Sequence, residues 1–279
     1  MSKPPSELRV AIAGLGAIGA RVAEALWAGS IPGLGLSAVS VRDVEKGRAR
    51  LQALGIGGDE APVPIVALDA LPDHADIIVE ALPAAAFRDV ATPAIAQARI
   101  LIVLSVGALL SAQDLIDRAR ETGAQIIAPS GAILGLDALR AAAEGEIERV
   151  TFKTRKPPKS LQGAPALDEL GIDLDGITEP LRLFKGPVSE AVRLFPANVN
   201  VAAAVSLAGI GPDRTEIEVW ADPNVQRNTH SVEVEASAAR FSMTIEGVPS
   251  PDNPRSGLMT PQSVLATLRR LRATLVVGT

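Results

Sequence analysis

The sequence predicts an α/β protein in which a doubly wound parallel sheet is followed by a second, α+β domain with a mixed or antiparallel sheet. In the first half of the chain, short β-branched runs alternate with alanine-rich helical stretches, the order of a parallel sheet flanked by helices. A glycine-rich turn joins the first run to the first helix. After residue 130 the runs become longer and alternate between apolar and polar residues, as in a sheet with one covered face.

The first domain is predicted over residues 1–130. Its strands are expected at 8–15, 36–43, 63–68, 75–82, 99–106 and 124–130, and its helices at 17–29, 84–98 and 111–123.

The second domain is predicted over residues 131–258 and is assigned substrate binding, catalysis and dimerisation. Its strands are expected at 148–156, 215–223 and within 231–247, and its helices at 186–195 and 198–211. The segment 259–279 forms a C-terminal helix that we expect to pack back on the first domain. Thr260 is its predicted N-cap and Pro261 its first helical residue.

The composition narrows the function classes. A net charge of −5 without a dense basic run argues against nucleic-acid binding, so small molecules are the expected partners. The chain has no cysteine and no tyrosine, which excludes thiolate and tyrosine chemistry, and its two histidines do not support a catalytic zinc site. No apolar run approaches the roughly 18 residues of a membrane span, so we expect a cytoplasmic protein without membrane contact.

The turn "GLGAIG" has the spacing of a dinucleotide-binding site. Gly14 permits the tight turn, Gly16 lets the backbone approach a pyrophosphate, and Gly19 lets the helix pack on the strand. Ile18, inside the motif, is also assigned to this site. In its strand–turn–helix context the motif predicts a Rossmann-type domain that binds NAD or NADP.

Asp43 follows the second predicted strand, where a carboxylate accepts the ribose hydroxyls of NAD. Arg42 beside it suits the extra phosphate of NADP, or is simply a solvated charge, so both cofactors stay open. Ser105 to Ala108 and Ser130 to Ala132 follow further strands, at the edge where ligands lie in such sheets. Ser130 is equally well explained as an ordinary helix N-cap.

His230 is the main candidate for proton transfer. On a strand after residue 228 it shares one face with Asn228, Val232 and Val234, which also fits a histidine buried in the core for structural reasons. Redox chemistry on an amine or alcohol needs a group that exchanges protons near neutral pH, and histidine supplies one. His74 precedes a strand in a turn and is interpreted as a surface residue.

Further polar residues are candidates for substrate contacts. Arg155 and Lys156 end a strand, together with Lys153, and a solvated strand edge explains these cations equally well. Asn198 and Asn200 begin an otherwise apolar helix, where an amide caps the helix or reaches a ligand.

Seven motifs, in this order, resemble those of the L-aspartate dehydrogenases, and the resemblance covers nearly the whole chain. They are "GLGAIG", "LSVGAL", "PSGAILGLDAL", "TRKPP", "FPANVNVAA", "DPNVQRNTH" and "NPRSGLMTPQSVLATLRRL". The resemblance implies NAD(P)-dependent oxidation of L-aspartate to iminosuccinate, which yields oxaloacetate and ammonia or feeds nicotinamide cofactor biosynthesis. It implies that His230 is catalytic and that Ala132 and Asn200 contact the cofactor.

Alternatives to this reaction remain at this point: a dehydrogenase or imine reductase acting on another amino acid or dicarboxylate, or a nicotinamide-binding protein without catalysis. A homodimer is expected from the second sheet.

Overall fold

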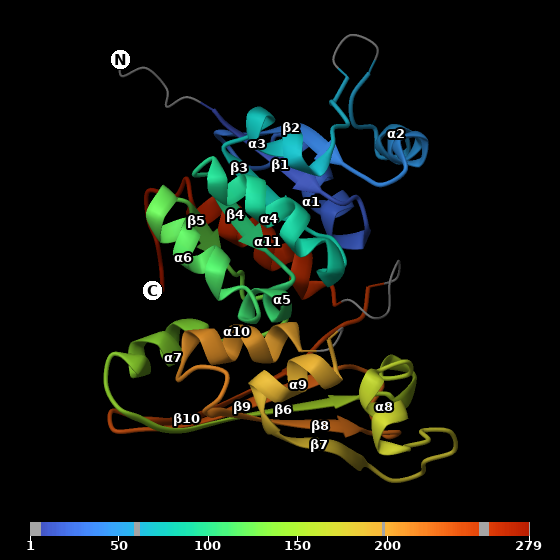
Figure 1. Cartoon of the computed structure of the whole chain (residues 1–279), viewed down its shortest axis with the longest axis vertical. Helices are drawn as coiled ribbons and strands as arrows, with labels where there is room; N and C mark the ends of the chain where they lie inside the picture. The colour runs from blue at the N-terminus through green and yellow to red at the C-terminus, as the bar shows by residue number, and fades with distance from the viewer. Residues whose placement is uncertain (1–6, 59–61, 197–198, 251–256, 279) are drawn as a thin grey trace. The chain divides into compact units, whose positions relative to one another are not determined.

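The computed structural model describes residues 7–58, 62–196, 199–250 and 257–278. The chain divides into two compact units (Figure 1). Unit 1 consists of Met1–Ser105, Ser111–Pro129 and Thr260–Val276, and unit 2 of Val106–Leu110, Ser130–Met259 and Val277–Thr279.

Unit 1 contains a five-stranded parallel sheet in the order β2-β1-β3-β4-β5. The strands are β1 (Leu8–Ala13), β2 (Leu34–Ser40), β3 (Ile77–Glu80), β4 (Ile100–Val103) and β5 (Gln125–Ile127). Every residue of β3 is buried, as expected for a parallel sheet with both faces covered. Because the chain leaves β1 toward β2 and returns to β3 on its other side, the order reverses at β1, and ligands bind at such a switch point.

The helices of unit 1 are α1 (Ala17–Trp27), α2 (Val44–Ala53), α3 (Leu71–His74), α4 (Phe87–Ala96), α6 (Gln113–Thr122) and α11 (Met259–Arg270), with 3-10 turns at Leu68–Ala70 and Ala84–Ala86. Helix α11 adds Val264 and Leu268 to the apolar core that strands β1 and β3 form with α1. Helix α11 begins at Met259, one residue before Thr260, the predicted N-cap.

Two of the expected strands differ in the structure. Residues 63–68 form no strand but a single bridge from Ile65 to Val39, and Pro64, which has no N–H to donate, stands beside it. The run 99–106 ends as a strand at Val103, and its last residue begins a short helix, α5 (Val106–Leu110), that belongs to unit 2.

Unit 2 contains a five-stranded mixed sheet in the order β10-β9-β6-β8-β7. The strands are β6 (Ile147–Lys156), β7 (Leu181–Pro187), β8 (Thr215–Ala221), β9 (Thr229–Ala236) and β10 (Arg240–Glu246). Strands β6 and β8 are parallel and the other pairs antiparallel. Strand β7 is not among the predicted strands.

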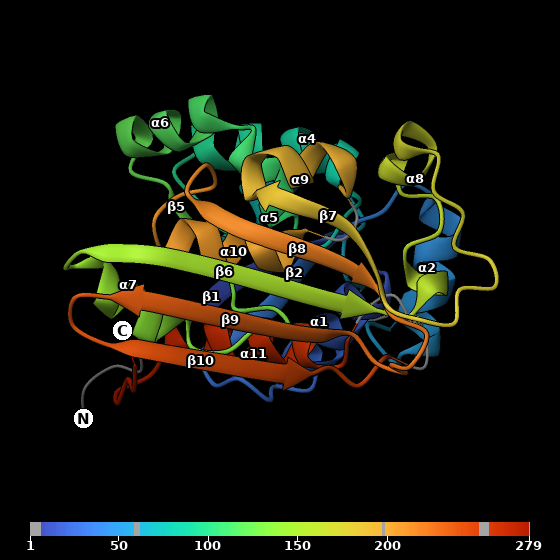
Figure 2. The ribbon, with the colours of Figure 1, turned by 90° about the horizontal axis from the view of Figure 1, so that it is seen from below.

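The helices of unit 2 are α5, α7 (Leu136–Ala143), α8 (Pro165–Leu170), α9 (Val188–Leu194) and α10 (Asn200–Ala208), with a 3-10 turn at Pro158–Ser160. Figure 2 shows α9 and α10 behind the sheet, on one of its faces. Strand β9 alternates accordingly: His230, Val232 and Val234 are buried, whereas Glu233 is exposed. The face of β9 on which His230 was predicted to lie, together with Val232 and Val234, is thus the buried face of the sheet. Among the described residues, no helix is long and apolar enough to cross a membrane.

Candidate functional site

The glycine-rich turn between β1 and α1 has the geometry that a dinucleotide requires. Gly14 has a φ of 97°, and a Cβ atom there would lie 2.6 Å from the carbonyl oxygen of Ala81. At Gly19 a Cβ would lie 1.9 Å from the carbonyl oxygen of Gly14, so helix and turn pack without room for a side chain. Gly16, the N-cap of α1, has no atom within 4 Å of a Cβ position. The open space at Gly16, beside unpaired amides at the helix N-terminus, fits a pyrophosphate.

Ile18 and Asp43 occupy different surroundings. The half-buried side chain of Ile18 packs against the core of unit 1, so only its backbone belongs to the turn. Asp43 is the N-cap of α2: its Oδ1 accepts a hydrogen bond from the Lys46 N–H at 3.1 Å, and Lys46 Nζ lies 3.4 Å from Oδ2. The Asp43 side chain remains 48% exposed and Arg42 is exposed as well, so groups suited to NAD and to NADP both stand at this edge.

A buried carboxylate, not singled out in the sequence, organises the loops after β3 and β4. Glu80 is fully buried and accepts hydrogen bonds from the N–H groups of Leu82, Leu104 and Ser105 at 3.0, 3.1 and 2.9 Å, and from Ser105 Oγ at 3.0 Å. Burial raises the pKa of Glu80 above its usual value, although these hydrogen bonds partly oppose the effect. Ser105 therefore serves the loop structure. The available signal was a lone acid in the apolar run "IIVEAL".

In unit 2, His230 lines a small pocket of about 40 Å³, which holds a few water molecules or one end of a small ligand. The segments that meet there are the turn after β5, the loop after β6, the loop before β9 with the start of β9, and the segment after β10. The lining residues are Ala132, Pro157, Ser160, Gln226, Arg227, Asn228, His230, Gly247, Pro249 and Gly257.

His230 is closely packed, but one of its ring nitrogens lacks a polar partner among the described residues. It is 3% exposed, lies between Thr154 of β6 and Ile245 of β10, and stacks on Phe152 with ring centroids 5.6 Å apart. Its Nδ1 is buried and has no hydrogen-bond partner among the described residues. Burial, and secondly the charge of Lys156, lower the pKa of His230 to about 3, so the imidazole is neutral at physiological pH. A histidine with a purely structural role would normally have its buried nitrogens satisfied.

The basic cluster at the end of β6 is divided between the two faces of the sheet. Arg155 pairs with Asp222 at 3.0 Å and lies 4.9 Å from the centre of a Trp220 ring, and Lys153 pairs with Glu218 at 3.7 Å. Lys156 lies on the covered face, 6% exposed, and burial lowers its pKa to about 8. Of these three cations, only Lys156 shares the face of His230.

The predicted cofactor contacts of unit 2 lie in two places. Ser130 does not cap α7, which begins at Leu136, but its carbonyl accepts the Ile133 N–H at 3.1 Å, and this turn brings Ala132 to the pocket of His230. Asn200 begins α10, and its Oδ1 accepts the N–H of Gly107 at 3.0 Å, which ties α10 to α5. Asn198 lies outside the described residues.

Arg227 was not proposed from the sequence as a substrate contact, although it stands in the same motif as His230. It is exposed, lines the pocket, and has no ion pair within the described part of the chain. Its guanidinium is a ready partner for a carboxylate. No cluster of three or more His, Asp or Glu residues suited to a metal ion occurs within the described ranges.

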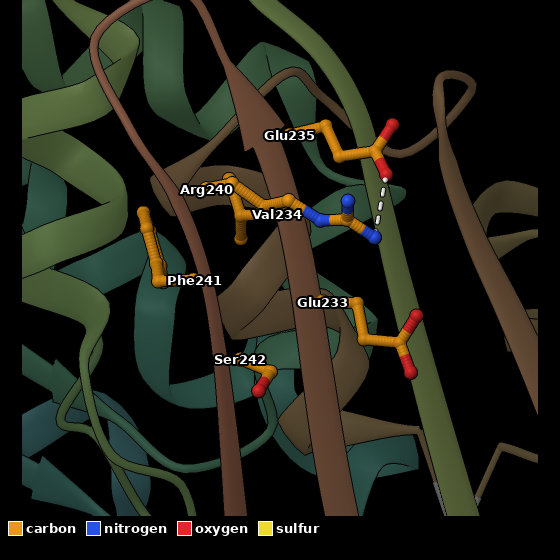
Figure 3. Close-up of a pocket in the computed structure, with 6 residues that line it drawn as sticks. All are labelled: Glu233, Val234, Glu235, Arg240, Phe241 and Ser242. Carbon is orange, nitrogen blue, oxygen red and sulfur yellow. Dashed lines mark ion pairs between the residues drawn. The ribbon is translucent and has the colours of Figure 1, made fainter.

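A second hollow lies on the β9–β10 hairpin (Figure 3). Glu235 there pairs with Arg240 at 3.5 Å and with Arg149 at 2.7 Å, so these charges are already satisfied. This hollow on the hairpin includes no residue of the candidate site, and we assign it no ligand.

Two family models match the chain. Residues 14–129 match the homoserine dehydrogenase NAD-binding domain, and residues 137–271 match the aspartate dehydrogenase C-terminal domain.

Curated relatives match over nearly the full length. The chain is 52% identical to an L-aspartate dehydrogenase of Bradyrhizobium diazoefficiens, covering 98% of this chain and 95% of that protein. It is 51% identical to L-aspartate dehydrogenase 3 of Bordetella bronchiseptica, covering 98% of each. The crystal structure of aspartate dehydrogenase from Thermotoga maritima matches with a TM-score of 0.72 at 25% identity, covering 97% of this chain and 99% of that one.

Proposed function

The chain belongs to the L-aspartate dehydrogenase family, and from this membership we propose that it catalyses the NAD(P)-dependent oxidation of L-aspartate to iminosuccinate. Water then converts the imine to oxaloacetate and ammonia. The observation in this structure that carries the proposal is His230: a neutral, buried imidazole whose Nδ1 has no hydrogen-bond partner among the described residues. Its pocket also holds Arg227, for which the described residues provide no ion pair.

The chemistry assigns a task to each of these groups. An aspartate ammonium must lose a proton before its nitrogen lone pair can form the C=N bond as the Cα hydrogen leaves with its electron pair. Neutral His230 is the acceptor for that proton, and a rigid, stacked imidazole keeps its orientation during the transfer. Arg227 holds a carboxylate of the substrate at the pocket rim.

The dinucleotide is NAD or NADP, and the residues of the glycine turn fit it. Gly14, Gly16, Gly19 and the backbone at Ile18 would hold the pyrophosphate, and Asp43 the adenosine ribose. When bound, the oxidised nicotinamide supplies the acceptor for the Cα hydrogen. Ala132 and Asn200 complete the predicted cofactor contacts, and Asn200 also steadies Gly107.

Of the predicted substrate contacts, Lys156 lies on the same covered face of the sheet as His230. Arg155 already pairs with Asp222 on the other face of the sheet.

Turnover is measured as growth of the reduced-nicotinamide absorbance with the purified protein, L-aspartate, and NAD or NADP at mildly alkaline pH. D-Aspartate, L-glutamate and L-alanine are the controls. We expect signal with L-aspartate only, and the two cofactors are ranked in the same assay. Cofactor binding without turnover of L-aspartate would contradict the proposal, and turnover of another amino acid instead would reassign the substrate.

We also propose that the protein is cytoplasmic, acts as a homodimer, and feeds nicotinamide cofactor biosynthesis. The sheet of unit 2 supports the dimer, because α9 and α10 lie on one of its faces (Figure 2), and the other face, which carries the exposed Glu233, can receive a second copy of the chain. Light scattering coupled to size-exclusion chromatography measures the subunit number directly, and a monomer at micromolar concentration would contradict the dimer.

A further inference from the structure

Lys156 is a buried cation for which the described residues provide no counter-ion. It is the last residue of β6, only 6% of its surface is exposed, and the described part of the chain offers it no ion pair. Burying an ammonium without an anionic partner is costly, and proteins that keep such a group generally use it. The two other basic residues among the last four of β6 are already paired: Lys153 with Glu218 and Arg155 with Asp222.

The strand register directs Lys156 to the candidate site. Thr154 pairs directly with His230 across β6 and β9, and Lys156 follows Thr154 by two residues, so all three lie on the covered face. Pro157, the next residue, lines the pocket of His230. Thr154 Oγ1 is itself buried without a hydrogen-bond partner in the described structure, so the site has several unsatisfied polar groups.

We infer that Lys156 determines the substrate specificity of this site: its buried ammonium is the counter-ion for the side-chain carboxylate of a four-carbon dicarboxylic amino acid. This inference rests on the proposed function and deepens it. Such a substrate has two carboxylates, and the site offers two cations that no described residue pairs with, Lys156 in the interior and Arg227 at the rim. A substrate with a methyl group in place of the carboxylate would leave the ammonium unpaired and would be rejected for that reason.

The same contact couples specificity to proton transfer. The charge of Lys156 is one cause that lowers the pKa of His230, after burial, so an unpaired Lys156 makes the imidazole a weak base. A carboxylate that pairs with Lys156 offsets this effect, and His230 then accepts a proton more readily. The other elements around His230 contribute Ile245 from β10 and Arg227 from the preceding loop, and Asp222 is engaged by Arg155.

The test uses succinate, which has both carboxylates of aspartate but no amine, and butyrate, which has one. Binding is followed in the full-length protein by the NMR signals of the imidazole rings, which are few because the chain has only two histidines. Lys156→Met removes the charge and keeps the length of the side chain. Lys153→Met is the matched control, with the same change on the same strand but on the opposite face.

We expect Lys156→Met to weaken succinate binding by about 10- to 100-fold and to leave butyrate binding nearly unchanged, the range expected for one charge-assisted contact. The control Lys153→Met should bind both acids as the unaltered protein does. Succinate, but not butyrate, should raise the pKa of His230, and Lys156→Met should abolish that difference. Equal succinate affinity in Lys156→Met and the unaltered protein would overturn the inference.

A second measurement needs no variant. Because Lys156 loses its charge above a pKa of about 8, succinate binding by the unaltered protein should weaken by up to tenfold per pH unit from pH 8 to 10, whereas Arg227 stays charged throughout. Affinity that is constant to pH 10 would refute the role of Lys156 even if the variant failed to fold.

The two proposals fail in different ways. If succinate binding depends on Lys156 but L-aspartate is not oxidised, the dicarboxylate site stands and the proposed reaction is wrong. If L-aspartate is oxidised and Lys156→Met keeps the full preference for it over L-alanine, the reaction stands and the specificity role is wrong.

Discussion

At the scale of single residues, the structure separates two explanations for His230 that the sequence left open. A histidine buried for packing and a catalytic histidine both fit the apolar face of a strand. The structure adds that Nδ1 has no partner among the described residues and that the ring lines a pocket with Arg227 and Asn228. A buried polar atom without a partner costs stability unless a ligand or water satisfies it. This favours the catalytic role.

Replacing His230 by alanine should reduce kcat for L-aspartate by about 10² to 10⁴, because a general acid or base typically contributes that much. Cofactor affinity should change little, since the glycine turn belongs to the other unit. Steady-state kinetics and a cofactor titration measure both quantities, and His74→Ala serves as the control. Normal turnover together with a lowered melting temperature would identify His230 as a packing residue.

Lys156 makes stability depend on pH in a defined window. Burial lowers its pKa from 10.5 to about 8, so between these values the unfolded chain binds more protons than the folded one. The cost of the buried charge is therefore full below pH 8 and is relieved as the pH rises toward 10.5. Relative to Lys156→Met, the free energy of unfolding should rise over this window by as much as about 3 kcal/mol, near 1.4 kcal/mol per pKa unit. Urea denaturation at pH 7 and pH 10 measures this, and a constant difference would contradict it.

At the scale of elements, the glycine turn shows why three glycines of one motif have different physical roles. Gly19 lacks room for a side chain because α1 packs against the turn, whereas at Gly16 no atom lies within 4 Å of a Cβ position. Packing within the protein therefore requires a glycine at position 19. At position 16 only a bound ligand would require one.

Because Gly16 and Gly19 differ in this way, alanine substitutions at the two positions form a matched pair of variants. Gly19→Ala should lower the melting temperature, because its methyl would overlap the carbonyl oxygen of Gly14. Gly16→Ala should keep the melting temperature and weaken dinucleotide binding by about tenfold or more, since a methyl there occupies the place of the pyrophosphate. Thermal unfolding and isothermal titration with NAD and NADP measure the two effects. Unweakened cofactor binding in Gly16→Ala would show that the pyrophosphate lies elsewhere.

At the scale of the whole molecule, unit 1 is built from both ends of the chain. Helix α11 follows almost the entire sequence of unit 2, yet Val264 and Leu268 are fully buried in the core of unit 1. The dinucleotide-binding unit is therefore incomplete without the last segment of the chain.

Leu268→Ala should destabilise unit 1 by about 2 to 5 kcal/mol, the usual cost of truncating a buried leucine. The exposed Leu275 is the matched control, and Leu275→Ala should cost less than about 0.5 kcal/mol. Cofactor binding during denaturant unfolding distinguishes the units, because it reports on unit 1. Equal effects of the two substitutions would show that α11 contributes little to that core.

The sequence by itself determined the features that depend on local periodicity. The parallel strands of unit 1, the glycine turn and the face of β9 that carries His230 all follow from residue spacing, because side chains alternate along a strand and recur every third or fourth residue along a helix. The residue pattern of β6 likewise separates Lys156 from Arg155, but it does not say which face is covered.

Only the tertiary structure decided which distant residues meet. Gly107 and Asn200 are joined by a hydrogen bond across 93 residues of sequence, and Glu80 holds a loop that begins 24 residues later. It also placed Lys156 rather than Arg155 on the face of His230. Such pairings depend on strand order and register, which the packing of the whole core selects, and no local pattern encodes them.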